Sequence, residues 1–128
     1  MIDVTCAIIM KEGKVLVTQR SEKMNLPLKW EFPGGKIDPN ETDIDCIIRE
    51  IKEELNIEIE ILKKLNPKQF DYEMFRINLI PFISYYVSGN IILSEHKDYK
   101  WLTRDDLHFI DWAPADIPVL EEFLKFDL

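Results

Sequence analysis

Three glutamates at helical spacing are the residues of this 128-residue chain whose types and positions most clearly indicate chemistry. Glu50, Glu53 and Glu54 stand at i, i+3 and i+4, so in a helix their carboxylates share one stripe. They repel one another near the helix end where the macrodipole disfavours anions, and none has a Lys or Arg four residues later. Oxygen ligands without His or Cys suit hard cations such as Mg²⁺ or Mn²⁺. The stripe therefore indicates a metal site.

A solvated acidic face is the alternative interpretation of the stripe, because most runs of like charge are solvated. At about 100° per residue, the carboxylates form an arc centred roughly 120° from the apolar arc, so they flank the buried face. Glu41 lies upstream, in the loop after Gly34-Gly35, and its carboxylate can converge on the same place. With a metal site there, we expect Mg²⁺ to stabilise the protein, because the metal-free helix leaves like charges unpaired.

Residues 42–55 form the helix that must carry these carboxylates. Thr42 is the expected N-cap, and Asn56 can end the helix in the left-handed conformation. Apolar residues that recur at helical spacing predict its buried face, namely Ile44, Ile47, Ile48, Ile51 and Leu55.

Strand patterns surround this helix. Apolar, β-branched or alternating residues predict strands at 3–10, 14–20, 30–32, 57–61, 68–76, 77–87, 91–94 and 99–102. The turn at Gly34-Gly35 suggests a backbone that needs unusual conformational freedom. Thr103 can cap a brief helix over 104–107, and Asp116 a final helix. With no repeat or linker, we expect one α/β or α+β layered domain spanning residues 1–128.

The composition restricts the class of partner. A net charge of −8 argues against a nucleic-acid polymer, but a small anion is compatible if metal ions neutralise the contact. No segment has the roughly 18–20 apolar residues of a membrane span, so no membrane partner is expected. Cys6 and Cys46 lie in apolar runs and are interpreted as reduced core thiols of a cytoplasmic protein. His96 and His108 lack the ligand spacing of a zinc site.

From Gly35 the chain reads G-x5-E-x7-R-E-I-K-E-E-L-N-I. This register resembles the Nudix box, GX5EX7REUXEEXGU, where U is an aliphatic residue. Every fixed letter matches except the last glycine, which is Asn56 here, and Asn is the next-best residue at a left-handed helix end. The resemblance implies the Nudix fold, an α/β/α sandwich around a central, mixed and curved β-sheet.

Segments outside the box extend the resemblance over nearly the whole chain. WEFPGGK at 30–36 and the Gln19-Arg20 pair look like the MutT-type subgroup. The stretch APADIP at 113–118 is similar to a base-binding segment of MutT-type and CTP pyrophosphohydrolase members. Glu95, six residues before Trp101, matches a loop glutamate of that subgroup.

The resemblance implies Mg²⁺-dependent, or Mn²⁺-dependent, hydrolysis of a nucleoside triphosphate to a monophosphate and pyrophosphate. Carried over by position, the implied metal ligands are Gly35, Glu50, Glu53, Glu54 and Glu95. The general base is either Glu50 or Glu95, and both alternatives stay open. Arg49 and Glu53 are also counted among the catalytic residues. For Arg49 we favour an ion pair with Glu41 that orients the carboxylates over direct contact with the phosphates.

The substrate side is assigned to Arg20, Glu31, Phe32, Phe75 and Asp116. Arg20 is a candidate for the phosphates or an ordinary surface charge, and Phe32 and Phe75 are candidates for base stacking or core packing. Asp116 is either a helix N-cap or a base-recognition residue. An ionised Asp only accepts hydrogen bonds, which tilts the expectation toward the amino group of cytosine over oxidised guanine, unless burial keeps the carboxyl protonated.

Two other functions are weighed against this one. An ADP-ribose or nucleotide-sugar pyrophosphatase is disfavoured, because the compact chain offers no additional N-terminal region for a dimeric sugar site. A non-catalytic, nucleotide-sensing Nudix module is disfavoured because the box carboxylates are intact and no basic helix exists. The expected partner is a small nucleotide, and the expected assembly is a monomer or a weak homodimer.

Overall fold

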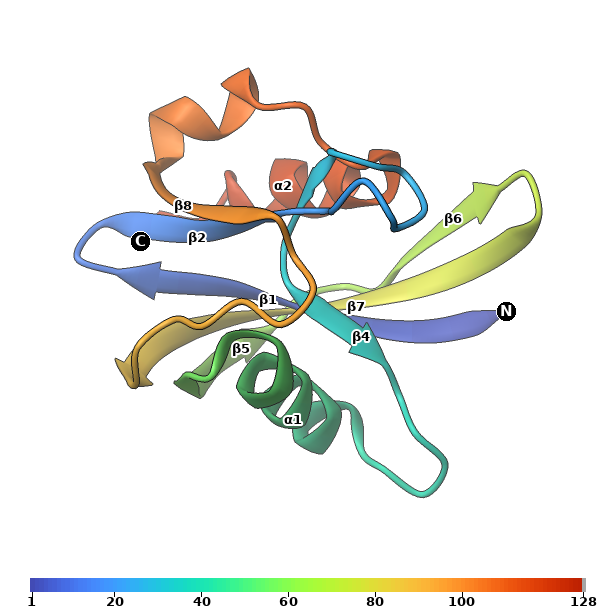
Figure 1. Cartoon of the computed structure of the whole chain (residues 1–128), viewed down its shortest axis with the longest axis horizontal. Coiled ribbons are helices and arrows are strands. Elements are labelled where there is room, and N and C mark those ends of the chain that lie inside the picture. The colour runs from blue at the N-terminus through green and yellow to red at the C-terminus, as the bar shows by residue number, and fades with distance from the viewer. Residues whose placement is uncertain (128) are drawn as a thin grey trace.

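The computed structural model describes residues 1–127, which form one mixed sheet between helices (Figure 1). Its strands are β1 (Ile2–Lys11), β2 (Lys14–Gln19), β3 (Trp30–Glu31), β4 (Gly34–Lys36), β5 (Glu58–Lys64), β6 (Lys68–Tyr72), β7 (Phe75–Ser88) and β8 (Asp98–Thr103). The α-helices are α1 (Asp43–Leu55) and α2 (Ile117–Phe123), and the 3-10 helices are η1 (Arg104–Phe109) and η2 (Pro114–Asp116). The assignment of residues 1–128 to one domain stays a prediction.

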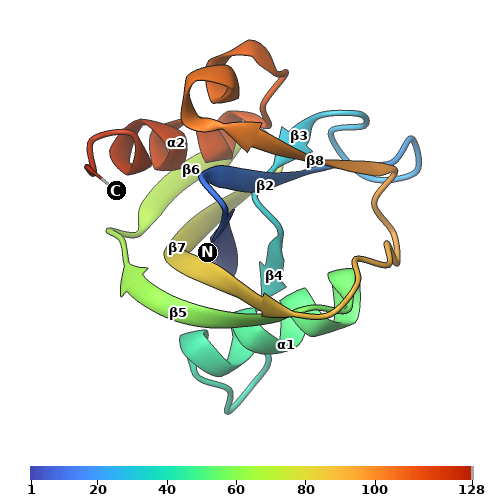
Figure 2. The same cartoon turned by 90° about the vertical axis from the view of Figure 1, so that its left-hand side faces the viewer.

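Strand β1 organises the sheet because it changes partners along its length. On one edge it runs parallel to β7 from Ile2 to Met10. On the other edge its last residues pair with β2, whereas Val4, Thr5 and Cys6 pair with β4. Strands β2 and β4 therefore diverge from β1, and the sheet is forked and curved (Figure 2).

Alternation along β1 supplies both faces of the core. Cys6 and Ile8 belong to a cluster that includes α2, and Ala7 and Ile9 belong to a second cluster that includes α1. The sheet thus lies between α1 and α2, as Figures 1 and 2 show. This arrangement confirms the predicted layered fold with a mixed sheet.

Helix α1 has the predicted ends and a slightly rotated buried face. The Thr42 hydroxyl accepts from the Asp45 N–H at 3.1 Å, and Asn56 has φ of 61° and ψ of 31°. The fully buried residues of the helix are Cys46, Ile47, Ile51 and Leu55. The prediction for Ile44 is wrong, since this residue is 45% exposed. Cys46 faces the sheet in its place, because its thiol lies against Thr5 of β1.

The predicted strand at 91–94 is absent. Its backbone instead meets the carbonyl end of α1, where Ile92 N–H donates to Leu55 O at 3.0 Å and Ser94 N–H to Glu54 O at 3.1 Å. These bonds satisfy helix carbonyls that have no partner within the helix. The strands predicted at 68–76 and 77–87 are present with a different boundary. They are β6 and β7, and the turn between them lies at 73–74.

Gly34 is required by close approach to the backbone of β1, Gly35 lies close to the end of the Glu50 side chain, and neither glycine has a positive φ. A Cβ atom on Gly34 would lie 1.9 Å from the Thr5 carbonyl oxygen. A Cβ atom on Gly35 would lie 2.3 Å from a carboxylate oxygen of Glu50. The prediction that this turn needs unusual conformational freedom is therefore wrong. The glycines matter because they lack a Cβ atom, which lets β4 lie against both β1 and α1.

Cys6 and Cys46 are both free and buried, in agreement with the sequence-based interpretation of core thiols. None of the helices within residues 1–127 has the length and apolar composition needed to cross a membrane.

The rotation of α1 can be tested with two isoleucine truncations. Ile51→Ala removes a fully buried side chain and should lower the free energy of unfolding by about 2–5 kcal/mol. Ile44→Ala, its matched control on the same helix, should lower it by less than about 1 kcal/mol, because Ile44 is half exposed. Urea denaturation measures both, and equal losses would contradict the observed helix orientation.

Candidate active site

A cleft of about 1070 Å³ opens at the fork of the sheet. Its walls come from the first half of β1, from β4, from the β6–β7 turn and from η2. Eight of the predicted site residues line it, namely Arg20, Glu31, Phe32, Gly35, Glu54, Phe75, Glu95 and Asp116. The remaining ones do not line the cleft, because they belong to α1 or to the residues directly before and after it: Glu41, Arg49, Glu50, Glu53 and Asn56. Glu50 nevertheless lies against Gly35 in its wall.

Arg49 is the hub of the carboxylates on α1. Its Nε donates to Glu41 Oε2 at 2.6 Å, and its Nη2 to Glu41 Oε1 at 2.9 Å, a bidentate pair. Its Nη1 donates to Glu50 Oε1 at 2.8 Å and to Glu53 Oε2 at 3.1 Å. The hydrogen bonds from Arg49 hold the pKa of Glu41 at about 2, and those to Glu41 and Glu50 raise the pKa of Arg49. The expected ion pair between Arg49 and Glu41 is present.

The expectation that the stripe leaves its charges unpaired is wrong for two of its three members. Arg49 precedes Glu53 by four residues and pairs with both Glu53 and Glu50, a direction that a search for downstream cations does not cover. Glu54 alone stays unpaired. Its Oε2 is buried with no hydrogen-bond partner among the described residues. Burial, with the charges of Glu50 and Glu31 nearby, raises the pKa of Glu54 to about 9.

The chemistry of these groups suits a hard divalent cation. The carboxylate oxygens of Glu50, Glu53 and Glu54 form an all-oxygen donor set on α1. Gly35 lies against Glu50, and its carbonyl oxygen accepts from the Thr5 hydroxyl at 3.2 Å. The buried, unpartnered Oε2 of Glu54 is the atom that a proton or a cation would satisfy. Among residues 1–127 no three His, Cys, Asp or Glu side chains already converge on one point. The guanidinium of Arg49 holds two of the candidate ligands instead.

Asp116 occupies a buried position in the same cleft. Its Oδ2 accepts the backbone N–H of Phe32 at 2.8 Å. The alternative role as a helix N-cap is wrong, because the Asp116 side chain makes no capping bond to α2. Burial, and then the charge of Glu31, raises the pKa of Asp116 well above its ordinary value. One carboxyl oxygen, Oδ1, is left for a ligand.

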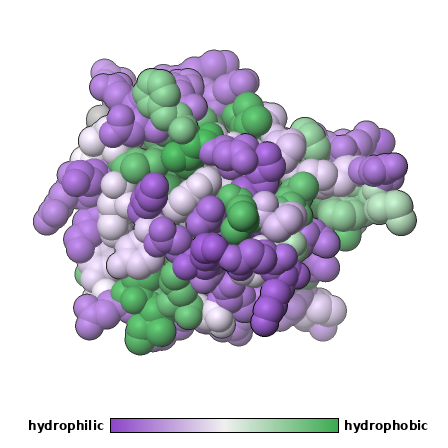
Figure 3. Space-filling model, turned by 45° about the horizontal axis from the view of Figure 1, so that its top comes forward, coloured by the Kyte–Doolittle hydropathy of each residue, from purple (hydrophilic) through white to green (hydrophobic). Residues whose placement is uncertain are grey.

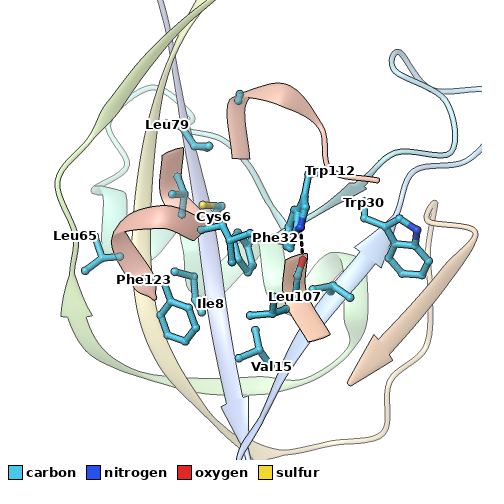
Figure 4. Close-up of a cluster of buried hydrophobic side chains, with 14 of the residues drawn as sticks. Cys6, Ile8, Val15, Trp30, Phe32, Leu65, Leu79, Leu107, Trp112 and Phe123 are labelled. Carbon is cyan, nitrogen blue, oxygen red and sulfur yellow. Dashed lines mark hydrogen bonds between the residues drawn. The ribbon is translucent and has the colours of Figure 1, made fainter. Parts of the chain in front are cut away.

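Two candidate substrate residues have other contacts in the structure. Arg20 is not free, since its Nε donates to Asn25 O at 2.6 Å and its Nη1 to Glu31 Oε1 at 2.9 Å. The Phe32 ring packs in the core, with its centroid 4.7 Å from that of the nearest Trp112 ring (Figure 4). Trp112 is itself fixed, because its Nε1 donates to Leu107 O. Its backbone N–H, rather than its ring, contacts Asp116.

The β6–β7 turn forms a hydrophobic rim of the cleft. Two apolar side chains of this rim are exposed, with Met74 at 87% and Phe75 at 42%. On the face in Figure 3, hydrophobic surface is scattered among hydrophilic surface, and the lobe at the right, where this hairpin lies in Figure 1, carries hydrophobic residues. The Phe75 ring lies 5.4 Å from that of Tyr72, so a planar base would meet aromatic surface here.

Two residues near the cleft were missed in the sequence. The Tyr72 hydroxyl accepts the Ala115 N–H at 3.2 Å and so fixes the segment that carries Asp116. The His96 Nε2 lies 2.8 Å from Glu31 Oε2. His96 was dismissed as a zinc ligand, and its position directly after Glu95 was the available signal.

The raised pKa of Glu54 predicts a pH dependence in metal-free protein. Between pH 4.5 and about 9 the folded state holds a proton that the unfolded chain has released, so stability falls as the pH rises. Glu54→Gln removes this loss, and its advantage over the parent protein should grow by roughly 4 kcal/mol from pH 5 to pH 8. Urea denaturation in EDTA measures the free energy of unfolding at each pH. Glu60→Gln, at an exposed position of β5, is the control for the lost charge. Parallel pH curves for parent and Glu54→Gln would contradict the burial of this carboxyl.

Comparisons with known proteins agree with this geometry. The NUDIX domain family model matches residues 1–123. The chain is 34% identical over 124 residues to the CTP pyrophosphohydrolase of Escherichia coli K12, covering 97% of this chain and 92% of that protein. It is 32% identical over 121 residues to the putative 8-oxo-dGTP diphosphatase 2 of Mycobacterium tuberculosis H37Rv, covering 88% and 81%.

A solved structure extends the likeness to three dimensions. The MutT protein of Methanosarcina mazei Go1 superposes with a TM-score of 0.87 at 28% identity, covering 97% of this chain and 93% of that one. The resemblance drawn from the box is thus confirmed. Nudix hydrolases generally use divalent metal ions, which agrees with the all-oxygen donor set beside β4. Since the family model and both relatives cover most of its length, the chain belongs to the Nudix hydrolase family.

Proposed function

We propose that this protein is a Mg²⁺-dependent nucleoside triphosphate pyrophosphohydrolase that releases a nucleoside monophosphate and pyrophosphate from cytidine or oxidised guanine nucleotides. One observation carries the proposal: a single cleft is lined both by the unpaired carboxylate of Glu54 and by the buried carboxyl of Asp116. A nucleotide has a polyanionic part and a base, and this cleft offers a distinct group for each. The names of the two relatives support the same substrate class.

Gly35, Glu50, Glu53 and Glu54 would hold Mg²⁺, with Mn²⁺ as an alternative. Glu50 and Glu53 must turn from Arg49 to do so, and Arg49 keeps Glu41 as its bidentate partner. The bound cation supplies charge neutralisation for the phosphates and a lowered pKa for an attacking water. An acidic protein with net charge −8 needs this neutralisation to bind a polyanion.

The chain's own groups would activate the water and orient the ligands. Glu50 and Glu95 remain the two candidates for the general base; Glu95 lines the cleft from the loop before β8, and Glu50 lies against Gly35. Arg49 orients the candidate ligands without contacting the substrate. It donates to Glu41, Glu50 and Glu53, and it does not line the cleft. The intact carboxylate set supports an enzyme over a nucleotide-sensing module.

The buried position of Asp116 changes the expectation for the base. A protonated carboxyl can donate to a carbonyl of oxidised guanine, while an ionised one accepts from the amino group of cytosine. Burial and Glu31 favour the protonated form, which moves the balance toward oxidised guanine without excluding cytosine. We also propose a cytoplasmic protein that is a monomer or a weak homodimer.

The metal assignment predicts the effect of a neutral isostere. Glu53→Gln should reduce Mg²⁺-dependent pyrophosphate release by at least about a hundredfold, because a carboxylate ligand becomes a weakly coordinating amide. The fold should persist, because the Glu53 side chain is 61% exposed and its recorded partner is Arg49. Pyrophosphate release and circular dichroism test both points. Glu60→Gln controls for the lost charge, and unchanged turnover in Glu53→Gln would refute the assignment.

The substrate assignment predicts a specificity change in Asp116→Asn. If the amide oxygen keeps the bond from Phe32 N–H, only the NH₂ group faces the base, and this group donates to a carbonyl but accepts nothing. The ratio of kcat/KM for 8-oxo-dGTP over dCTP should therefore rise roughly tenfold, the value of about one hydrogen bond.

The screen should include CTP, 5-methyl-dCTP, ADP-ribose and dinucleoside polyphosphates beside these two substrates. Asp111→Asn is the matched control, since that carboxylate is exposed and pairs with Lys29. An unchanged ratio in Asp116→Asn would refute base recognition by Asp116. A preference of the parent protein for ADP-ribose would favour the second enzyme class.

A further inference from the structure

We propose that His96 is a positioning residue that, through Glu31 and Arg20, locks together two loops of the cleft and thereby holds Glu95 toward the carboxylates of α1. The inference rests on the proposed function, because it concerns how the metal side of that cleft is kept in place. It is carried by a largely shielded series of side chains from three separate segments outside the Nudix box, namely Arg20, Glu31 and His96.

Glu31 is the middle member of this series of side chains. Its Oε1 accepts from Arg20 Nη1 at 2.9 Å, and its Oε2 lies 2.8 Å from His96 Nε2. An ionised carboxylate has no proton to give, so Nε2 of His96 is assigned as the donor. The three side chains are 19%, 16% and 3% exposed for Arg20, Glu31 and His96 respectively. The ion pair is therefore shielded from solvent, where a lost partner costs more than at the surface.

His96 is not explained as a packing residue. Its Nδ1 is buried without a hydrogen-bond partner among the described residues. An unpartnered buried polar atom destabilises a fold, and an apolar side chain of similar size would avoid that loss. The gain from the imidazole is its bond to Glu31, so the role of His96 is to hold that carboxylate.

The loop that carries His96 also carries Glu95 and is anchored on both sides. Before it, Ser94 N–H donates to Glu54 O at 3.1 Å, and after it, Lys97 N–H donates to Gln19 O at 2.9 Å. These backbone bonds fix the ends of the loop, and the buried His96 side chain fixes its middle. With His96 directed to Glu31, the neighbouring Glu95 is left to line the cleft with Glu54.

At the other end of this series of side chains, Arg20 holds a strained loop. Arg20 donates from Nε to Asn25 O at 2.6 Å, inside the loop 21–28. Leu26 and Leu28 of this loop have φ of 52° and 65°, a region that bulky residues rarely adopt. Such strain persists only where surrounding contacts enforce it, and it concentrates at functional sites. Leu26 lines the cleft together with Glu95, so the contact from Arg20 helps to shape the cleft wall.

The test uses direct metal binding as well as activity. In His96→Ala, Mn²⁺ affinity measured by electron paramagnetic resonance without substrate should fall about tenfold, as for other residues that orient ligands. The Mg²⁺ concentration for half-maximal pyrophosphate release should rise by a similar factor. His96→Gln, whose amide N–H can still donate to Glu31, should recover most of both losses. Lys97→Ala, the matched control on the same loop, removes an exposed pair with Glu22 and should change neither.

Mn²⁺ affinity and Mg²⁺ half-saturation within twofold of the parent protein in a folded His96→Ala variant would overturn the inference. If that variant does not fold, Glu31→Gln carries the test, because it keeps the shape and removes the charge that His96 and Arg20 hold; the same tenfold losses are expected. Failure of the proposed function is distinguishable, since the parent protein would then release no pyrophosphate in Mg²⁺. An active parent with unaffected His96 and Glu31 variants would refute only the positioning role.

Discussion

The structure depends on how it balances the carboxylates that converge beside β4. Arg49 pairs with Glu41, Glu50 and Glu53, so one guanidinium turns mutual repulsion into a connected network. Glu54 stands outside this network, with a buried Oε2 atom that has no hydrogen-bond partner among the described residues. These ion pairs reduce the repulsion within the acidic stripe of the helix. The Glu54 carboxylate remains as the group that a proton or a cation can satisfy.

The fork of the sheet brings this balanced cluster to a binding cleft. Because β1 pairs with β2 at one end and with β4 at the other, the edge between them opens. Two glycines without a Cβ let β4 approach β1 and the Glu50 carboxylate closely. Asp116, buried and held by the Phe32 N–H, lines the same opening. Metal chemistry and base recognition can therefore share one cleft.

Acidic side chains with little exposure to solvent are the common element of that cleft. Glu31 is held by Arg20 and His96, Asp116 by a backbone N–H, and Glu54 by none of these. The charge of Glu31 contributes to the raised pKa of both Asp116 and Glu54. These three acids thus form one electrostatic unit, in which fixing Glu31 also fixes the field that the other two experience. This coupling gives residues outside the Nudix box a part in the site.

The sequence by itself determined what depends on near neighbours. The spacing of Glu50, Glu53 and Glu54, the Thr42 cap and the left-handed Asn56 all follow from helix geometry, and they were predicted correctly. Only the tertiary structure decided which partner each group meets. It exposed Ile44, turned residues 91–94 onto the end of α1, and withdrew Asp116 from the helix cap. It also joined His96 to Glu31, 65 positions away. Such contacts depend on strand register and on the fork of β1, which no local pattern specifies.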